Sequence, residues 1–549
     1  MSTPPETSGT SGRPVDGQYA LGIDLGTGGP KVALVSQSGR VAASAFEPVA
    51  MHLVEGGGAE QDPDEWWRAV TRAVRRMLEE SGARAADVVG VGCTGQWSGT
   101  VATAEDGSPL RPAITWMDSR GSRSIRRQAA GRVNAFGYDV RKLQRWIRLT
   151  GGAPGHSGKD PTAHILWIRD NEPDVYRATH KFLEPVDWLN QRLTGRFSAS
   201  YDSIVVHWVT DNRQVDRVHY DDTLLTMAGL ERAKLPDLAP SASVVGPLRD
   251  VAAQELGLDA GTPVTTATGD VHSAAVGSGA VADFAAHLYI GTSSWITCHV
   301  PFKKTDVRTN VASIPAAVPG RYLVADEHET AGACLTFLAE NMGWAEDAGI
   351  AGSLGSGGAG GSGAENDPYR RLDGIAAQVP AGANGVMFTP WLNGERSPVD
   401  DHTIRAGFHN LSLATTRSDL VRAVYEGVAL NSRWLLEAVE HFVKRRFGLL
   451  AFIGGGANSA LWAQIHADVT GRPIRPVVEP VLANVRGAGL LVWLALGRID
   501  VGDIARAVEV GATFTPDPVV RPLYDARYAE FVNLYKQTRQ IHRRLNRAL

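Results

Sequence analysis

The sequence predicts an α/β protein built from two related halves that face each other across a cleft. Three observations support this prediction. Apolar runs alternate with amphipathic segments along the chain, an apolar run entering a Gly-Thr-small turn occurs at 21–29 and again at 288–295, and a third apolar run enters a glycine turn at 454–456. Because the repeated run opens each half of the chain, we expect a duplicated architecture.

Size and composition narrow the class of protein. A chain of 549 residues allows two to four domains, and 43% apolar with 21% charged residues is typical of a globular protein. The net charge of −4 gives no reason to expect a nucleic-acid partner. Three cysteines without a CxxC motif exclude a disulfide scaffold and a cysteine zinc site. Without a long apolar run or a secretory signal pattern, we expect a cytoplasmic protein with no membrane contact.

The first half begins with strands. Residues 1–18 are rich in Ser, Thr, Pro and Gly and are expected to be disordered, whereas 19–46 predict a β-meander. A helix is expected over 62–82, with Asp62 as N-cap, Pro63 at the first position and Gly82 at the end. A strand at 86–95 and helices around 164–173 and 186–195 follow.

The second half repeats the alternation. We expect a strand at 262–270, a strand pair at 287–300, a helix at 333–344, one long or two abutting helices at 418–446, and a strand, glycine turn and helix at 449–471. Residues 352–366 are almost all Gly, Ser and Ala and predict a flexible loop. The C-terminal segment 524–549 has a helical pattern.

The first glycine turn is a candidate phosphate site. After Asp24, the residues Gly26, Thr27 and Gly28 leave backbone N–H groups open, while the Thr27 hydroxyl and the Lys31 ammonium suit phosphate oxygens. Asp24 suits Mg²⁺ through water. The alternative is an ordinary hairpin with incidental glycines.

Two further turns fit the same chemistry. One contains Gly291, Thr292 and Ser293 and resembles the first turn, although these residue types are common in all turns. The other lies between a strand and a helix, the arrangement that aims amides and a helix dipole at a phosphate, and contains Gly454, Gly455, Gly456 and Asn458. Neither the dinucleotide spacing GxGxxG nor a P-loop pattern occurs.

Asp270 is a candidate general base. It follows a strand and a glycine, where a carboxylate can reach a substrate hydroxyl. The alternative is an aspartate that only forms a turn. For His272, two residues on, packing is the simplest interpretation.

A sugar site is indicated by two polar and aromatic segments. Gln96, Trp97 and Ser98 follow a strand, and Asp118 and Arg120 lie about twenty residues further along. Indole rings stack on sugar C–H faces while the polar groups bind hydroxyls. A core tryptophan is the alternative, since the chain has 14.

Together these motifs resemble the FGGY carbohydrate kinases, and the pattern is closest to the xylulose kinases of that family. The matching stretches include GIDLGTGGPKVALV, AEQDPDEWW, GCTGQWSG with ITWMDSR, ATGDVHSAAVGSG, YIGTSSW, FTPWLNGERSPVDD, RAVYEGVAL and FIGGGANSALW, in family order from about residue 20 to 500. Several motifs in one order are more specific than any one of them.

The resemblance implies an actin-like, ribonuclease H-like fold of two domains, 19–278 and 279–549. It implies transfer of the ATP γ-phosphoryl group to a sugar hydroxyl, with Mg²⁺ bridging the phosphates. Asp270 would then be the base and, with Asp24, would face the metal. The three glycine turns would hold ATP, and Gln96, Trp97, Ser98 and Asp118 would line the sugar site.

Three departures from the family pattern bear on the substrate. The usual DLGTSGVK is DLGTGGPK here, so a serine hydroxyl and, at Pro30, a backbone donor are missing. Gln-Met-His-Gly is replaced by Gln-Trp-Ser-Gly, and the Asn after the catalytic Asp by Val271. A pentulose such as D-xylulose is the first substrate to consider. Another ketose, a pentitol, a gluconate-like sugar acid and an inactive sugar or nucleotide sensor stay open, as does a homodimer.

Overall fold

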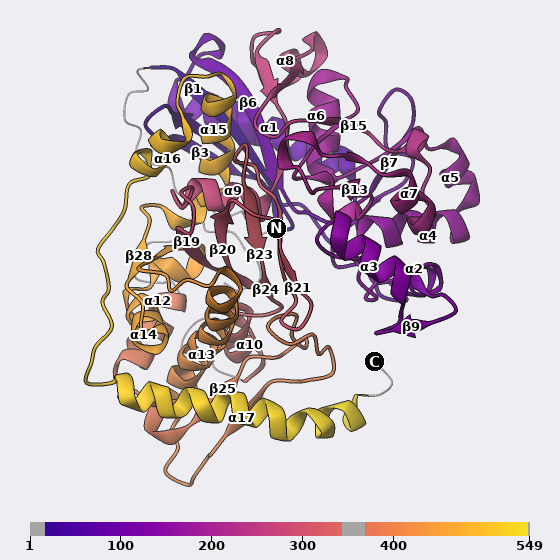
Figure 1. Ribbon diagram of the computed structural model, residues 1–549. Coiled ribbons are helices and arrows are strands. Elements are labelled where there is room, and N and C mark those ends of the chain that lie inside the picture. The colour runs from indigo at the N-terminus through magenta and orange to yellow at the C-terminus, as the bar shows by residue number, and fades with distance from the viewer. Residues whose placement is uncertain (1–16, 343–367, 547–549) are drawn as a thin grey trace, which may run out of the picture.

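The computed structural model describes residues 17–342 and 368–546. Most of the predicted N-terminal tail, the predicted 352–366 loop and the last three residues of the predicted C-terminal helix lie outside the described residues. The chain forms two large sheets, one in each half, with helices packed around them and several short strand pairs besides (Figure 1).

The first sheet contains the meander expected at 19–46. Its strand order is β16-β17-β6-β1-β2-β3, and β18 also pairs with β6. β1 runs antiparallel to β2 and parallel to β6, so the N-terminal hairpin continues into a parallel centre. The strands are β1 (Tyr19–Gly26), β2 (Gly29–Ser36), β3 (Val41–Phe46), β6 (Val88–Gly95), β16 (Val244–Pro247), β17 (Pro263–Thr265) and β18 (Thr268–Gly269).

Helices cover both faces of this sheet. α1 (Pro63–Ser81), α6 (Pro185–Thr194) and α8 (Asp250–Leu256) share one core with it. As predicted, Asp62 caps α1, by accepting from the Asp64 N–H, and Gly82 ends it in the left-handed conformation. α9 (Asp270–Gly277) and α15 (Ala483–Ala495) pack on the other face.

α15 comes from the second half of the sequence but packs on the sheet of the first (Figure 1). Two glycines permit this approach: a Cβ at Gly277 would collide with the Ala483 carbonyl, and one at Gly487 with the Ser273 carbonyl. The Trp493 indole donates to the Val35 carbonyl at 3.0 Å. The halves are therefore joined across the sheet that carries the first glycine turn.

A helical lobe is inserted between β8 and β16. It has its own apolar core and contains α2 (Ser122–Ala129), α3 (Val140–Leu149), α4 (Pro161–Asn171), α5 (Pro173–Ala178) and α7 (Asp222–Ala228). Short sheets separate from the large one complete the first half: β4 (His52–Val54) with β5 (Gly58–Gln61) and β8 (Ala113–Ile114), β7 (Val101–Thr103) with β11 (Lys181–Leu183), β9 (Asn134–Ala135) with β10 (Tyr138–Asp139), β12 (Ser198–Ser200) with β15 (Asp237–Ala239), and β13 (Thr210–Asp211) with β14 (His219–Tyr220).

The second sheet has the order β21-β22-β23-β20-β19-β27-β28, with β24 paired to β20. Here too an antiparallel hairpin, β19–β20, lies beside a parallel strand, β27. The strands are β19 (Ala286–Ile290), β20 (Ser294–Val300), β21 (Thr305–Asp306), β22 (Val311–Pro315), β23 (Tyr322–Ala325), β24 (Glu327–His328), β27 (Leu450–Ile453) and β28 (Ile474–Pro476).

The second half is completed by helices and one short strand pair. They are α10 (Ala333–Asn341), α12 (Pro368–Ala377), α13 (Arg417–Val443), α14 (Ala460–Thr470), α16 (Val501–Ala507), α17 (Arg521–Leu545), and β25 (Met387–Thr389) with β26 (Gly407–His409). The segment expected to form one helix or two is a single helix, α13. α17 begins at Arg521, before the predicted start at 524.

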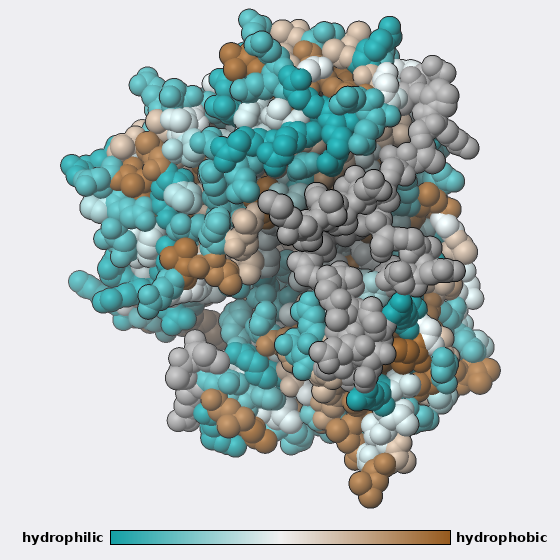
Figure 2. Space-filling model, turned by 180° about the vertical axis from the view of Figure 1, so that it is seen from behind, coloured by the Kyte–Doolittle hydropathy of each residue, from teal (hydrophilic) through white to brown (hydrophobic). Residues whose placement is uncertain are grey.

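One face of the molecule shows how polar and apolar residues are distributed over the surface. In Figure 2, hydrophilic residues cover most of the visible face and hydrophobic ones form small separate groups. Within 17–342 and 368–546, none of the helices combines the length and apolarity needed to cross a bilayer.

Candidate functional site

The first hairpin presents a two-residue turn. β1 and β2 pair as far as Gly26 with Gly29, leaving Thr27 and Gly28 between them. Gly29 has φ of +133°, and a Cβ there would collide with the Glu47 carbonyl, so the position requires glycine. Gly28 is exposed, with open space where a side chain would start. The outer side of the turn is therefore accessible to a ligand.

The buried Gln61 and the half-buried Trp116 hold Thr27. The Gln61 Nε2 donates to the Thr27 carbonyl at 2.8 Å, and the Trp116 Nε1 donates to the Thr27 hydroxyl at 3.0 Å. Because the hydroxyl accepts from Trp116, its own proton is left to donate elsewhere. The Arg396 guanidinium, from the second half, lies 5.8 Å from the Trp116 ring centroid. Trp116, from the ITWMDSR motif, thus contacts the first turn.

Lys31 connects the halves. Its Nζ donates to the Val481 carbonyl at 3.0 Å, in the second half of the sequence. An ammonium has three N–H donors, so this bond leaves two for other acceptors. Lys31 also faces Asp24 across the hairpin register.

The second hairpin is held by main-chain bonds. The Gly291 N–H donates to the Ser293 carbonyl at 2.9 Å and closes the turn. The Ala331 N–H donates to the Thr292 carbonyl at 2.9 Å, and the Gly332 N–H to the Gly291 carbonyl at 2.8 Å. α10 begins directly after Gly332, so the turn lies against a helix N-terminus.

The third glycine segment lies beside the second hairpin. Gly454 has φ of +84°, and a Cβ there would lie 2.5 Å from the carbonyl of Ile290, the last residue of β19. A Cβ at Gly456 would lie 2.6 Å from the Ile290 side chain, whereas Gly455 and Asn458 are exposed. The structure therefore brings two of the three predicted ATP turns into contact.

Asp24 and Asp270 belong to one electrostatic cluster. Burial raises the pKa of Asp270 to about 7, with smaller contributions from the negative charges of Asp24 and Glu327. Burial also raises the pKa of Asp24, although the nearby Lys31 opposes the shift. Asp270 is the first residue of α9, directly after β18, so the expected strand-end carboxylate also begins a helix.

Tyr289 connects this cluster to the second hairpin. Burial raises the pKa of its phenol, and both Asp270 and Asp24 raise it further. Tyr289 stacks on Trp295 across the hairpin, with ring centroids 3.7 Å apart. The two carboxylates thus lie near the strand that leads into the second turn.

The sugar loop, Gln96–Gly99, lies at the end of β6. Gln96 is buried and its Nε2 donates to the Gln61 Oε1 at 2.9 Å. The Trp97 indole donates to the Ser203 carbonyl at 2.8 Å and meets the His272 ring edge-on, with centroids 4.9 Å apart. Ser98 has φ of +61°, and the Gly99 N–H donates to Glu184 at 3.0 Å. The tryptophan is therefore partly a packing residue, as the alternative interpretation held.

Asp118 is engaged within the protein. Its carboxylate accepts from the Ala59 N–H at 3.0 Å, the Arg120 N–H at 2.9 Å and the Arg120 guanidinium at 2.6 Å. Arg120 also pairs with Glu60 at 2.5 Å and lies 4.1 Å from the Trp167 ring centroid. Since both Asp118 oxygens already accept hydrogen bonds, this geometry gives no support to a sugar contact there.

Sequence reasoning missed Gln61, Tyr289, Glu327 and Arg396. Gln61 and Arg396 lie in AEQDPDEWW and FTPWLNGERSPVDD, which were recognised as motifs without a role. No pattern in the sequence around Glu327 indicated that its charge would act on Asp270.

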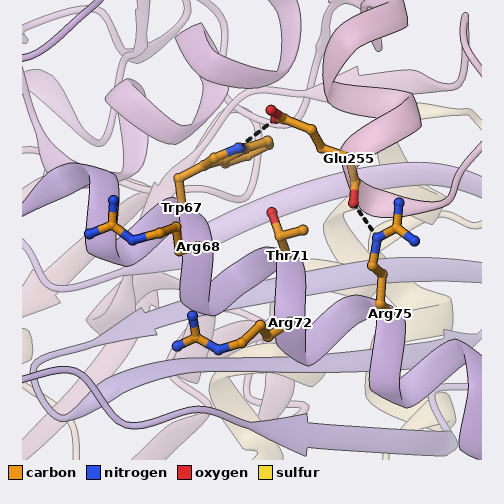
Figure 3. A pocket seen from close by; sticks show the side chains of 6 residues that line it. All are labelled: Trp67, Arg68, Thr71, Arg72, Arg75 and Glu255. Atoms are coloured by element: carbon orange, nitrogen blue, oxygen red, sulfur yellow. Dashed lines mark hydrogen bonds between the residues drawn. The ribbon is translucent and has the colours of Figure 1, made fainter.

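Another pocket, of about 410 Å³, lies between α1 and α8 and is lined by Trp67, Arg68, Thr71, Arg72, Arg75 and Glu255 (Figure 3). Glu255 accepts from the Trp67 indole at 2.6 Å, and its carbonyl accepts from Arg75 at 2.6 Å. The Arg68 and Arg72 guanidinium groups point away from Glu255 (Figure 3). None of the predicted site residues lines this pocket.

The site thus combines two hairpins, one in each half of the chain, with the buried carboxylates Asp24 and Asp270. The chain matches the N-terminal domain of the FGGY family of carbohydrate kinases over residues 19–277 and its C-terminal domain over 286–495. It belongs to that family and is a carbohydrate kinase, which confirms the predicted family, fold class and enzyme class.

Similar proteins include xylulose kinase from Staphylococcus epidermidis, 27% identical over 538 residues that cover 95% of this chain and 98% of the relative. Autoinducer-2 kinase from Klebsiella pneumoniae is 28% identical, covering 94% and 93%. Among solved structures, a Brucella ovis xylulose kinase aligns with a TM-score of 0.81 at 24% identity, covering 95% and 100%. A Plasmodium falciparum glycerol kinase with ADP aligns with a TM-score of 0.76 at 18% identity, covering 94% and 98%.

Proposed function

We propose that this kinase transfers the γ-phosphoryl group of ATP to a hydroxyl of a small sugar, with a pentulose such as D-xylulose as the first substrate to test. The observation that carries the proposal is the electrostatic cluster of Asp24 and Asp270 beside Tyr289, which joins the carboxylates to the second hairpin. The similar xylulose kinases support a pentulose.

The nucleotide would lie along the three glycine turns. Gly26, Thr27 and Gly28 would face the phosphates from one side, and Gly291, Thr292 and Ser293 from the other, while Lys31 has N–H donors to spare. The adenosine would lie at Gly454–Gly456 and Asn458, where Gly455 is open. The glycerol kinase structure with ADP supports a nucleotide in this fold.

Phosphoryl transfer would use Asp270 as base. The sugar hydroxyl oxygen forms a bond to the γ-phosphorus, the bond from that phosphorus to the β,γ-bridging oxygen breaks, and ADP leaves. The hydroxyl proton passes to the Asp270 carboxylate. A pKa near 7 lets this carboxylate lose and regain a proton at neutral pH. Sugar contacts would come from Gln96, Trp97 and Ser98.

The carboxylate pair suits a magnesium ion. Two neighbouring acidic groups with raised pKa values are stabilised by a cation. In the described part of the chain, no group of three or more His, Cys, Asp or Glu forms a metal site. This fits Mg²⁺, which is usually bound by one or two carboxylates together with substrate phosphates. When bound, it would neutralise charge on the transferring phosphoryl group.

The test is a coupled assay of ADP formation across ketoses, pentitols and aldonic acids. The proposal expects sugar-dependent ADP formation, highest with a pentulose. Turnover on another ketose, on a pentitol or on a sugar acid would replace the pentulose as the substrate. Ser98 and Val271 stand where the family pattern has a histidine and an asparagine that would contact the sugar, and Trp97 replaces a methionine, so these alternatives stay open. Thermal stabilisation by a sugar without ADP formation would indicate a sensor instead.

A further inference from the structure

We propose that Gln61 is a positioning residue for phosphoryl transfer, which fixes the first turn (Thr27–Gly28) and ties it to the sugar loop. The proposal rests on the kinase function proposed above. It also gives a role to the motif AEQDPDEWW, which the resemblance left without one.

Gln61 ends β5 and is fully buried. Its Nε2 donates to two carbonyls, that of Thr27 at 2.8 Å and that of Ala50 at 3.3 Å. Its Oε1 accepts from two N–H donors, the Gln96 Nε2 at 2.9 Å and the Trp66 Nε1 at 3.2 Å. All four hydrogen-bonding positions of the amide are used.

These partners fix the orientation of the amide. The Thr27 and Ala50 carbonyls can only accept, and the Trp66 indole can only donate, so a flipped amide would face like with like on both sides. One rigid side chain therefore touches both the turn that would hold phosphate and the loop that would hold the sugar.

The neighbours of Gln61 keep it in place. Glu60 pairs with Arg111 and Arg120, each at 2.5 Å, and Asp62 caps α1. The residues on both sides of Gln61 are thus anchored by other contacts. Positioning within about 1 Å matters for transfer between two bound substrates, because misplacement lowers the fraction of reactive geometries.

The two sides of the amide make the role testable. Gln61→Glu keeps an oxygen for Gln96 and Trp66 but replaces the donor to Thr27 and Ala50 with a carboxylate oxygen. It should therefore release the first turn and leave the sugar loop held. Gln61→Ala removes both connections without placing a charge against carbonyls, and it serves if the glutamate variant does not fold.

The experiment measures MgATP affinity by titration calorimetry, and steady-state constants with the sugar that turns over fastest in the substrate panel. Losing a buried hydrogen bond typically costs about tenfold in an equilibrium. We expect Gln61→Glu to weaken MgATP binding and raise the KM for ATP about tenfold, with the sugar KM within about twofold. Gln61→Ala should raise both KM values.

Asn212→Asp is the matched control. Asn212 is also a buried amide, and its Nδ2 donates to the Thr150 carbonyl at 3.0 Å, away from both turns. It should lower the melting temperature without changing MgATP affinity. Wild-type MgATP affinity and KM values in both Gln61 variants would overturn the assignment of Gln61. Absence of wild-type turnover on any sugar would instead overturn the proposed function.

Discussion

The two hairpins have the same topology but are held in different ways. At the first, Thr27 is fixed by side chains from distant segments, Gln61 and Trp116. At the second, Gly291 and Thr292 are fixed by backbone N–H groups of the segment before α10. The difference teaches that similar turns in a duplicated fold can differ in which substitutions damage them. The first turn should be sensitive to substitution of the side chains that hold Thr27. The second should be sensitive to a methyl group added at Gly332.

The largest effect is expected from substitution of Asp270. Each hairpin contributes one residue within electrostatic range of it, Asp24 from the first and Tyr289 from the second. Asp270→Asn should lower kcat by about 10²- to 10⁴-fold, the usual contribution of a general base. The fold should persist, because asparagine removes a charge that burial disfavours. Sugar-dependent ADP formation and a melting curve check both points, and full turnover in this variant would show that Asp270 is not the base.

The next effect is on pH, since both halves of the chain supply charges that face Asp270. Its pKa of about 7 predicts that kcat/KM falls about tenfold per pH unit below neutrality, because the protonated group cannot accept a proton. The folded-state pKa lies above the ordinary 3.8, so the folded form binds this proton more tightly and the contribution to stability declines as pH rises from about 4 through 7. Asp270→Asn should remove that decline in a series of denaturation curves, and an unchanged series would contradict it.

An added methyl group should affect the two hairpins differently. A Cβ at Gly332 would collide with the Gly291 carbonyl, so Gly332→Ala should displace the second turn and weaken MgATP binding about tenfold. Gly28→Ala adds the same methyl group at the first turn, where it meets open space, so it should leave the melting temperature unchanged, whereas Gly332→Ala should lower it. Melting curves without ligand compare the two turns, MgATP titration follows the second, and equal falls in melting temperature would contradict the comparison.

Substitution of Trp116 should instead affect the first turn and leave the second unchanged. Trp116→Phe keeps an aromatic ring beside Arg396 but removes the donor to the Thr27 hydroxyl. We expect the KM for ATP to rise about fivefold, less than for a fully buried hydrogen bond, because Trp116 is only half-buried. The second hairpin should be unaffected, which can be followed from the fluorescence of the stacked pair Tyr289 and Trp295 in a sugar-free titration. A wild-type KM would show that the first turn holds itself.

The smallest effect is expected from loss of the ion pair between Lys159 of the first half and Glu329 of the second. The Lys159 Nζ lies 3.7 Å from Glu329, whose carboxylate is also paired with Arg396. Because Arg396 still neutralises Glu329, Lys159→Gln should change kcat/KM by about twofold at low salt, and by less at high salt. Kinetics at two ionic strengths check this, and a large loss would give Lys159 a role beyond the ion pair.

The sequence by itself determined the family, the paired halves and most elements near the turns. Strand alternation, the Asp62 cap and the helix end at Gly82 act through near neighbours, so local pattern is enough to find them. It could not determine that Trp116 would contact Thr27 or that Asp118 would accept from the Ala59 N–H, because those contacts join distant segments.

Tertiary structure alone decided the environment of the candidate carboxylates. The pKa of Asp270 depends on burial and on charges from Asp24 and Glu327, which lie 246 and 57 residues away in the sequence and which the fold places within electrostatic range. The return of α15 to the first sheet is likewise set by which faces remain uncovered once both halves have formed. Residue identity fixes the chemical groups available, whereas their reactivity depends on solvent exclusion and neighbours, and only packing supplies these.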